Sequence, residues 1–125
     1  MANKCVNSPQ APAAVGPYSH SVLAGDTLYI SGQLGIDPAV GAMKETVTEQ
    51  ATQALINLGS ILKESGMDYS NVVKTTVFLK SMGDFAAINA IYGEYFSSNP
   101  PARSCVAVAE LPLGGLFEVE AVAVR

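Results

Sequence analysis

Two strand-like segments near the C-terminus carry the residues best suited to chemistry. Arg103 and Cys105 stand in the first segment, and Glu118 and Glu120 stand in the second. Residues two apart in a strand share a face, so each of these pairs is expected to point to one side of its strand. A guanidinium keeps its charge and is rarely left without an anionic partner. Arg103 is therefore expected either to pair with one of these glutamates or to bind a carboxylate that is not part of the protein.

The two segments are the apolar runs 102–109 and 116–124, which are rich in β-branched residues. Pro or Gly bounds each run, which predicts two strands. The short Leu-Pro-Leu-Gly-Gly connection between them favours a hairpin. An α+β arrangement is predicted for the rest of the chain from periodicity, turn residues and a capping-box spacing between Thr46 and Glu49. The expected elements are an extended leader over 1–15, strands over 16–23 and 28–31, a helix from Val47, a strand over 71–80 and a helix after Asp84.

The order of these elements limits how they can pack. A strand–helix–strand crossover predicts that 71–80 and 102–109 are parallel neighbours in one sheet. Alternation along 71–80 places the odd-numbered residues from Val73 to Leu79 on one side. Two helices cannot cover both faces of such a sheet, so we expect them on one face. Hydrophobic residues make up 49% of the chain and charged ones 14%, so the uncovered face is expected to meet another subunit.

Composition excludes several classes of function. A chain of 125 residues fits one domain over 1–125, and its net charge of −4 argues against nucleic-acid binding because no basic stripe is available for phosphates. No apolar run approaches the ~20 residues of a membrane span, and the N-terminus lacks a signal-peptide core. One histidine and two cysteines cannot build an ordinary zinc site. We expect a soluble protein of a reducing compartment, the cytoplasm, without a metal.

Six stretches of the chain are specific when taken together and in order: GPYSH at 16–20, ISGQLG at 30–35, VVKTTVFL at 72–79, NAIY at 89–92, PPARSCVAVAELP at 100–112 and EVEAVAV at 118–124. They resemble the RidA (YjgF/YER057c/UK114) family of reactive-intermediate deaminases. The resemblance implies a chorismate-mutase-like α+β fold of order β-β-α-β-α-β-β, with two helices on one face of a mixed sheet. It also implies a barrel-shaped homotrimer with its sheets facing inward and with sites in the clefts between subunits.

The activity implied by the resemblance is hydrolysis of enamines and imines, typically 2-iminopropanoate and 2-iminobutanoate, to 2-keto acids and ammonia. Arg103 matches the arginine that holds the substrate carboxylate, and Glu118 matches the glutamate that positions or deprotonates the attacking water. Cys105 matches the site cysteine, whose main chain can orient the imine. An imine is already electrophilic, so orientation and one base can suffice without a cofactor. Residues matching the lining of the same cleft are Tyr18, Ser31 and Asn89.

Other interpretations stay open for individual residues and for the whole protein. Gly32 and Gly35 either let the backbone approach a ligand or simply end a strand. Cys105 can be a small buried apolar residue. His20, where relatives often carry glutamine, is expected to be exposed, and Leu113 replaces a lysine of many relatives near the cleft mouth. The alternative functions are a carboxylate- or keto-acid-binding regulatory module and, with less support, an endoribonuclease or a holdase chaperone.

Overall fold

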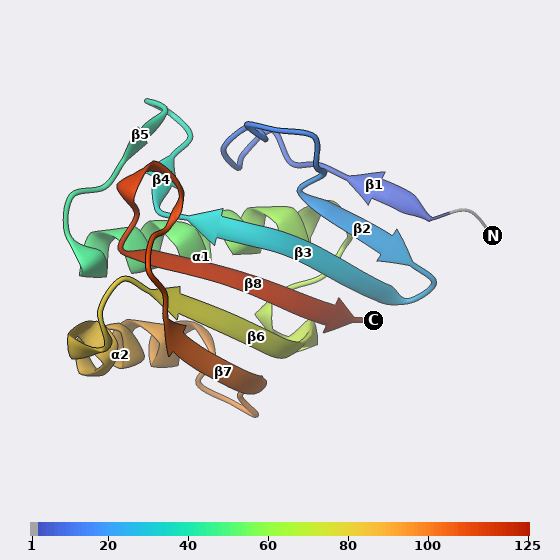
Figure 1. Cartoon of the computed structure of the whole chain (residues 1–125). Coiled ribbons are helices and arrows are strands. Elements are labelled where there is room, and N and C mark those ends of the chain that lie inside the picture. Colours follow the sequence, from blue (N-terminus) through green and yellow to red (C-terminus); the bar gives the residue numbers. More distant parts are fainter. Residues whose placement is uncertain (1–2) are drawn as a thin grey trace.

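A computed structural model, which describes residues 3–125, has two α-helices and a six-stranded main sheet (Figure 1). The predicted order β-β-α-β-α-β-β is confirmed by the elements from β2 to β8, and three further short strands are added to it. One of them lies in the leader, whose residues 1–2 fall outside the described part. The elements are β1 (Lys4–Val6), β2 (Ser21–Ala24), β3 (Thr27–Leu34), β4 (Ile36–Asp37), β5 (Ala42–Met43), α1 (Val47–Glu64), β6 (Val72–Leu79), α2 (Phe85–Tyr95), β7 (Ala102–Ala107) and β8 (Phe117–Val124).

The main sheet has the strand order β1-β2-β3-β8-β6-β7, while β4 and β5 pair separately. Its neighbours are antiparallel except β6 and β7, which confirms the predicted parallel pair. The predicted hairpin between the last two strands is wrong, because β6 lies between β7 and β8 (Figure 1). Residues 108–116 connect these strands, whereas tight hairpin loops have about two to five residues. This longer connection lets the chain cross over β6.

Helix α1 begins and ends as its sequence signals predict. The backbone N–H of Glu49 donates to Thr46 Oγ1 at 3.2 Å, and that of Thr46 donates to Glu49 Oε1 at 3.2 Å, which closes the capping box. Gly66, just beyond the helix, has a φ of 69°, a left-handed conformation that favours glycine. Between these ends, one apolar face is completely buried, and its members include Ala51, Ala54, Leu55, Leu58 and Leu62.

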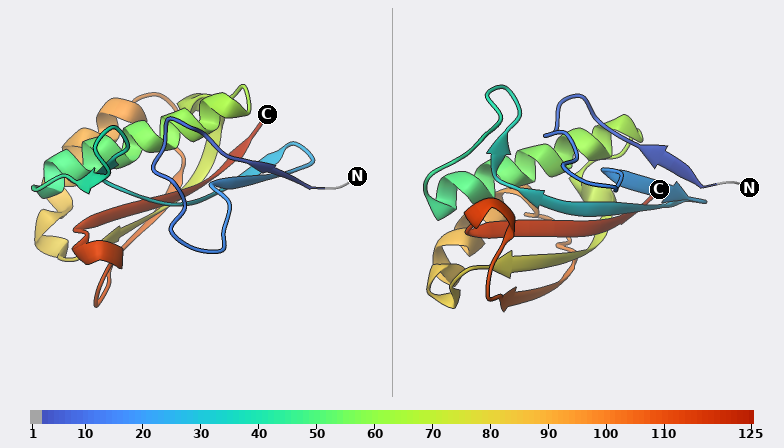
Figure 2. Two further views of the ribbon diagram at one scale, coloured as in Figure 1. Left: turned by 90° about the horizontal axis from the view of Figure 1, so that it is seen from above. Right: turned by 45° about the horizontal axis from the view of Figure 1, so that its top comes forward.

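Both helices cover the same face of the main sheet, as predicted, so the molecule has two layers (Figure 2). Alternate side chains of β8 enter the core between the layers, beginning with Phe117 and Val119, which are both 0% exposed. The helix α2 contributes Ile88 and Tyr92 to the same core. The Tyr92 hydroxyl lies 2.6 Å from Thr75 Oγ1, so these two buried polar groups satisfy each other.

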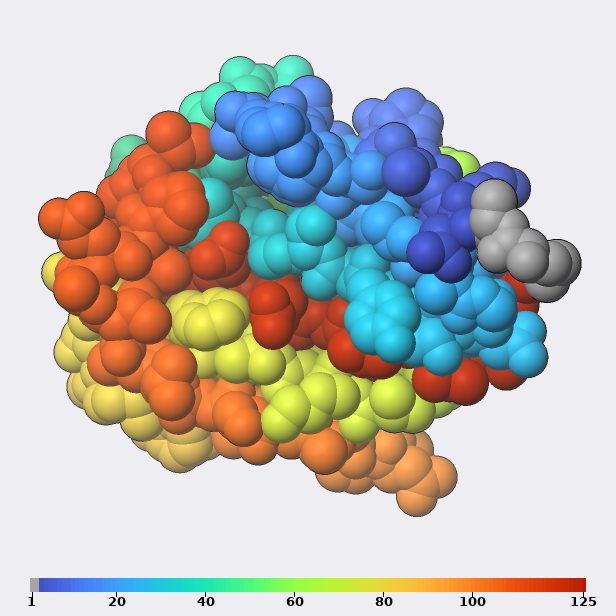
Figure 3. All heavy atoms as spheres, turned by 45° about the vertical axis from the view of Figure 1, so that its right-hand side comes forward, coloured from blue at the N-terminus to red at the C-terminus, as the bar shows by residue number. Residues whose placement is uncertain are grey.

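The opposite face of the sheet carries no helix. Figure 3 shows much of this face, where β3 (cyan) and β8 (red) cross between the N-terminal segment (blue) and the chain after β7 (orange). Large apolar side chains remain accessible on it, including Tyr29 at 54% and Val106 at 45% exposure. Accessible apolar area of this kind is a feature of surfaces that bind partners.

One residue of β6 differs from its predicted orientation. Alternation places Val73 on one side of this strand together with the other odd-numbered residues. That prediction is wrong for Val73, which is 49% exposed, and right for Thr75, Val77 and Leu79, which are buried. The pairing of β6 with β8 shifts between Val72 and Lys74. Such a bulge inserts an extra residue and turns it away from the ladder.

Candidate functional site

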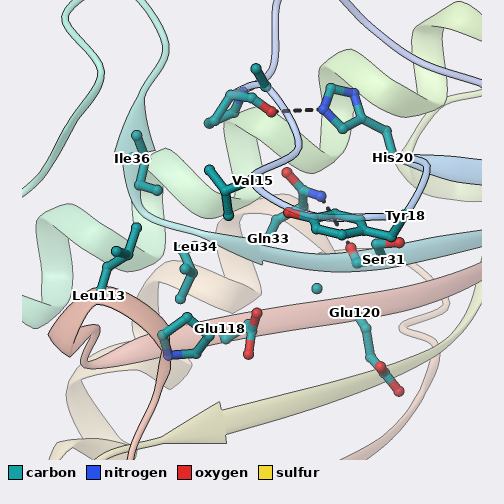
Figure 4. Close-up of a pocket in the computed structure, with 14 residues that line it drawn as sticks. Val15, Tyr18, His20, Ser31, Gln33, Leu34, Ile36, Leu113, Glu118 and Glu120 are labelled. Carbon is teal, nitrogen blue, oxygen red and sulfur yellow. Dashed lines mark hydrogen bonds between the residues drawn. The ribbon is translucent and has the colours of Figure 1, made fainter.

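A groove of about 430 Å³ lies on the helix-free face, with β3 and β8 along its floor (Figure 4). Four residues of the expected site line this groove, namely Tyr18, Ser31, Gly32 and Glu118. The remaining expected residues, Arg103, Cys105 and Asn89, are not among its lining. The complete lining is Pro12, Ala13, Val15, Tyr18, His20, Ser31, Gly32, Gln33, Leu34, Ile36, Pro112, Leu113, Glu118 and Glu120.

Glu118 is the central acid of the groove. Figure 4 shows its carboxylate directed into the groove, whereas that of Glu120 points away. A methyl group on Gly32 would lie 2.5 Å from Glu118 Oε2, so the glycine leaves room for the carboxylate against β3. Burial raises the pKa of Glu118, and the nearby charge of Glu120 raises it further. A carboxylate with a raised pKa is a stronger base in its ionised form.

The floor of the groove is irregular where β3 passes Glu118. The pairing of β3 with β8 shifts between Ile30 and Gln33, so Ser31 and Gly32 lie at a bulge. Ser31 Oγ donates to the carbonyl of Ser19 at 2.7 Å, which fixes the hydroxyl and leaves its oxygen free to accept a hydrogen bond. Bulges often re-aim side chains beside active sites. Sequence reasoning allowed Gly32 to end its strand, but β3 continues through it to Leu34.

His20 is buried at 5% exposure, so the prediction of an exposed strand residue is wrong. Its Nδ1 accepts a hydrogen bond from the backbone N–H of Ser8 at 3.1 Å, and its Nε2 lies 2.7 Å from the carbonyl of Pro12. Acceptance at Nδ1 and donation at Nε2 together describe a neutral imidazole. The ring thus ties the leader to the groove wall, a long-range contact that no local sequence pattern reveals.

The groove has an apolar end opposite its acidic floor. Leu34 and Ile36 lie beside Leu113 and Val15 there (Figure 4). Leu113 is 67% exposed and has a φ of 57°, which is uncommon for a residue other than glycine. The sequence analysis places Leu113 near a cleft mouth, and the structure has it at the rim of this groove. Its side chain adds apolar surface without a charge.

Arg103 belongs to a second cluster, built by β7 and α2. Its Nη1 donates to Asn89 Oδ1 at 2.7 Å. The guanidinium carbon lies 4.7 Å from the ring centroid of Tyr92 and 5.4 Å from that of Phe85, within the range of cation–π attraction. Spacings of four and three residues put these α2 side chains on one helical face. Phe85 and Tyr92 were not among the residues expected at the site, although their spacing around Asn89 was a usable signal.

Cys105 shares the face of Arg103, as the strand alternation predicts. It is half-buried and packs against the hydrophobic core. Burial raises the pKa of its thiol, although the Arg103 charge opposes part of that effect. A raised pKa keeps the thiol protonated and therefore weakly nucleophilic at neutral pH.

The two clusters lie on opposite faces of the sheet. In β6, Thr75 pairs with Arg103, while Phe78 pairs with Glu118. An odd-numbered and an even-numbered residue of a regular strand point to opposite sides, and paired residues share a side. Within residues 3–125, Arg103 accordingly makes no salt bridge to Glu118 or Glu120. The sequence allowed Arg103 either to pair with one of these glutamates or to bind a carboxylate from outside the protein, and the first of these two expectations is wrong.

In the described part of the chain, no group of three or more His, Cys, Asp or Glu side chains is placed to hold a metal ion. The helices between residues 3 and 125 are too short or too polar to cross a membrane.

Comparison with known proteins adds a family and relatives. A family model described as Endoribonuclease L-PSP matches residues 8–125. The 2-iminobutanoate/2-iminopropanoate deaminase of Capra hircus is 51% identical over 100% of this chain and 92% of its own length. The protein with the same name from Homo sapiens is 49% identical over the same shares.

Solved structures agree with these sequence relatives. The structure of the E. coli YjgF gene product is 42% identical, with a TM-score of 0.95 and 98% coverage of both chains. The structure of E. coli TdcF with bound serine is 38% identical, with a TM-score of 0.94 and 98% coverage of both chains. At these identities the likeness extends beyond the fold to the family.

Proposed function

Since this chain belongs to the Endoribonuclease L-PSP family, the RidA family of the sequence resemblance, we propose that it is an imine deaminase. Its substrates are 2-imino acids such as 2-iminopropanoate and 2-iminobutanoate, and its products are 2-keto acids and ammonia. The observation that carries this proposal is the identity of about one half, over the whole chain, to relatives named for that activity.

The site that we propose is shared between two subunits. Arg103 and Glu118 lie on opposite faces of one sheet, so they cannot act on one small substrate within one chain. A second copy removes the difficulty if its Glu118 groove faces the Arg103 cluster of the first. The exposed apolar side chains of the helix-free face, such as Tyr29, support burial against such a copy. The family resemblance suggests three copies around a closed ring.

In this site Arg103 holds the substrate carboxylate. A planar guanidinium can donate two parallel hydrogen bonds to a carboxylate. Asn89 and the ring of Tyr92 orient the guanidinium before any substrate arrives, which lowers the entropy lost on binding. Asn89 Oδ1 accepts from one guanidinium nitrogen, Nη1, so other N–H groups of Arg103 remain available as donors.

Glu118 of the neighbouring groove activates the water. Its carboxylate takes a proton from a water molecule while the water oxygen bonds to the imine carbon. The electrons of the C=N double bond move to nitrogen, which takes up a proton. That proton is the one that Glu118 removed from the water. The resulting carbinolamine breaks its C–N bond as its nitrogen takes a second proton from the Tyr18 phenol, while its hydroxyl proton passes to Glu118 as the C=O bond forms. Return of this proton to Tyr18 through water restores both side chains, and ammonia and the keto acid are released. The raised pKa of Glu118 suits a base that works near neutral pH.

The other expected residues have supporting roles in this proposal. Main-chain groups of Cys105 orient the imine, and its protonated thiol takes no covalent part. Ser31 accepts a hydrogen bond from the attacking water or from the substrate nitrogen, because its own proton is engaged by Ser19. Tyr18, 47% exposed at the groove edge, provides a phenol that can donate a proton to the leaving nitrogen. Gly32 supports substrate binding by leaving room for the Glu118 carboxylate.

The proposal also covers the domain organisation, the cofactor requirement and the cellular location. Residues 1–125 act as one domain, and the chemistry needs no cofactor because the imine carbon is already electrophilic. We propose the cytoplasm as its location, since Cys5 and Cys105 are both free thiols.

Two rival functions have specific observations behind them. The solved E. coli TdcF holds serine, a ligand with a carboxylate, which favours a binding module without turnover. The family description favours RNA cleavage. The groove argues against RNA, because Glu118 and Glu120 would repel phosphates and the chain has a net charge of −4.

The test is release of keto acid from freshly generated 2-iminopropanoate and 2-iminobutanoate. We expect wild type to exceed the buffer rate, and Arg103→Ala to lose about 100-fold or more in kcat/KM because the carboxylate anchor is gone. Glu118→Gln should lose about 100-fold through its base while it still binds a keto acid. Circular dichroism checks that each variant is folded.

Each rival predicts a different pattern in this assay. A binding module would bind pyruvate through Arg103 without any rate above buffer. An RNase would cleave RNA in a way that Glu118→Gln abolishes. Either pattern, in folded protein, would overturn the deaminase proposal.

A further inference from the structure

Two buried amide side chains of α1, Gln50 and Asn57, have no part in the chemistry proposed above. Gln50 is 3% exposed and Asn57 is 0% exposed. Burying an amide is unfavourable unless its donors and acceptors find partners. The partners of both side chains therefore indicate what these residues do.

Gln50 connects α1 to the start of β8. Its Oε1 accepts from the backbone N–H of Leu116 at 2.8 Å, and its Nε2 donates to the carbonyl of Lys44 at 2.8 Å. Leu116 precedes β8 directly and stands two residues before Glu118. The glutamine thus holds the backbone from which the acid of the groove extends.

Asn57, two turns further along α1, holds the facing strand. Its Nδ2 donates to the carbonyls of Leu34 at 3.2 Å and Ile36 at 2.9 Å, and its Oδ1 accepts from Gln53 Nε2 at 2.9 Å. Leu34 is the register partner of Glu118 in the β3–β8 ladder. Both strand ends beside Glu118 are therefore fixed from the helix layer.

The sheet alone holds these strand ends weakly. Beyond the bulge in β3, the ladder with β8 has only the pairs Gln33–Val119 and Leu34–Glu118. Gly35 follows at once, and a side chain there would collide with the backbone of Gln50, so helix and strand are in direct contact. The amide bonds of α1 supply the constraint that the interrupted ladder lacks.

We propose that Gln50 and Asn57 are positioning residues that fix the Glu118 carboxylate in its groove through the ends of β8 and β3. The expected loss of imine hydrolysis rests on the proposed function, whereas the placement of the Glu118 carboxylate rests on the hydrogen bonds alone. A shift of about 1 Å in a catalytic group can reduce a rate by about 100-fold.

The kinetic test uses Gln50→Met, which has a similar volume and removes both hydrogen bonds. We expect kcat for imine hydrolysis to fall about 10- to 100-fold, while KM changes less than about 3-fold, because the Arg103 cluster is untouched. Gln50→Glu keeps an acceptor for Leu116 and is expected to lose less. The control is Ile61→Val, a change at a buried core residue of the same helix, one turn beyond Asn57, that removes no hydrogen-bonding group. It should lower thermal stability without changing kcat.

A second readout does not depend on activity. The Glu118 carboxyl is followed by ¹³C NMR during a pH titration of wild type, Gln50→Met and Asn57→Leu. Looser strand ends admit water, so we expect the pKa of Glu118 to fall towards its ordinary value in both variants but not in Ile61→Val. An inactive wild type would refute only the deaminase proposal, since this titration would still test positioning. If Glu118 titrates alike in all four proteins, the positioning inference is wrong. Should Gln50→Met fail to fold, Gln50→Glu and Asn57→Leu carry the same test.

Discussion

The Arg103 cluster and the Glu118 groove are two half-sites that differ in how they are held. Three side chains of α2 contact the guanidinium at the sheet edge. Asn89 accepts a hydrogen bond from it, and the rings of Phe85 and Tyr92 lie against it. The Glu118 carboxylate instead stands on a bulged floor and makes no ion pair within residues 3–125. The first half-site presents a cation that is already held in place, and the second presents a carboxylate without a cation of the described chain beside it.

Because Arg103 and Glu118 lie on opposite faces, one sheet carries both residues without an ion pair between them. An ion pair inside one chain would lower the pKa of Glu118 and occupy the guanidinium. Opposite faces prevent that pairing, so Arg103 stays open to a carboxylate and Glu118 stays a base. Assembly then brings the halves together only across a subunit boundary, where a substrate can lie between them.

Subunit complementation gives the largest expected effect. Arg103→Ala and Glu118→Gln subunits are each nearly inactive, but denatured together and refolded they should recover activity. Random mixing leaves both residues intact in about one quarter of shared sites, so about a quarter of the wild-type rate is expected. The measurement is keto-acid release from the mixture compared with each variant refolded alone.

A double variant, Arg103→Ala with Glu118→Gln, is the control for this experiment. Mixed with an equal amount of wild type, it contributes no half-site, so only about one quarter of the shared sites keep both residues, about half of what the same wild type supplies unmixed. Absence of recovery in the first mixture, with mixed oligomers verified by mass spectrometry, would contradict a shared site.

Gly32→Ala is expected to damage the Glu118 half alone. The added methyl would lie 2.5 Å from Glu118 Oε2 and would displace the carboxylate. We predict a loss of about 10- to 100-fold in kcat, with affinity for pyruvate changed less than about 3-fold, measured by steady-state kinetics and calorimetry. The matched control is Gly93→Ala, where a methyl meets nothing within 4 Å. In the last turn of α2 it should add up to about 1 kcal/mol of stability and leave kcat unchanged. Equal kinetics in the two variants would refute the prediction.

Local signals in the sequence were enough for most of the fold. The capping box of Thr46 and Glu49 located the start of α1, and the crossover rule made β6 and β7 parallel neighbours. The failures involve contacts between distant segments. The hairpin prediction missed that β6 inserts between β7 and β8, and the bulge at Val73 depends on the register with β8.

The candidate site was predicted in composition but not in arrangement. Residue types and the family resemblance selected Tyr18, Ser31 and Glu118, which do share a groove. They did not show that Arg103 lies on the opposite face of the sheet from these three residues. The face to which a strand side chain points depends on how the strand is paired, and a shift of one residue in the register reverses it. His20 was misjudged for a similar reason, since its partners Ser8 and Pro12 reach it only when the leader folds back.

The smallest predicted effect concerns thermal stability. It tests whether the ionised Glu118 carboxylate destabilises the folded protein. Burial and Glu120 raise the pKa of Glu118 above its ordinary value of 4.5, so the folded protein binds this proton more tightly than the unfolded chain does. The carboxyl therefore stabilises the fold least when it is ionised, and stability falls as pH rises from about 4.5 through the raised pKa. Glu118→Gln removes this penalty, so its Tm should exceed that of wild type by a few degrees at pH 7 and approach it near pH 4.

Glu120→Gln sharpens this prediction by removing only the exposed neighbouring charge. It relieves part of the repulsion on Glu118 and leaves its burial unchanged, so its gain in Tm at pH 7 should be smaller than that of Glu118→Gln. Scanning calorimetry of the three proteins at both pH values makes the comparison. A lower Tm for Glu118→Gln at pH 7 would contradict the prediction. It would mean that a cation of another subunit already lies against Glu118, and that the two halves meet before substrate binds.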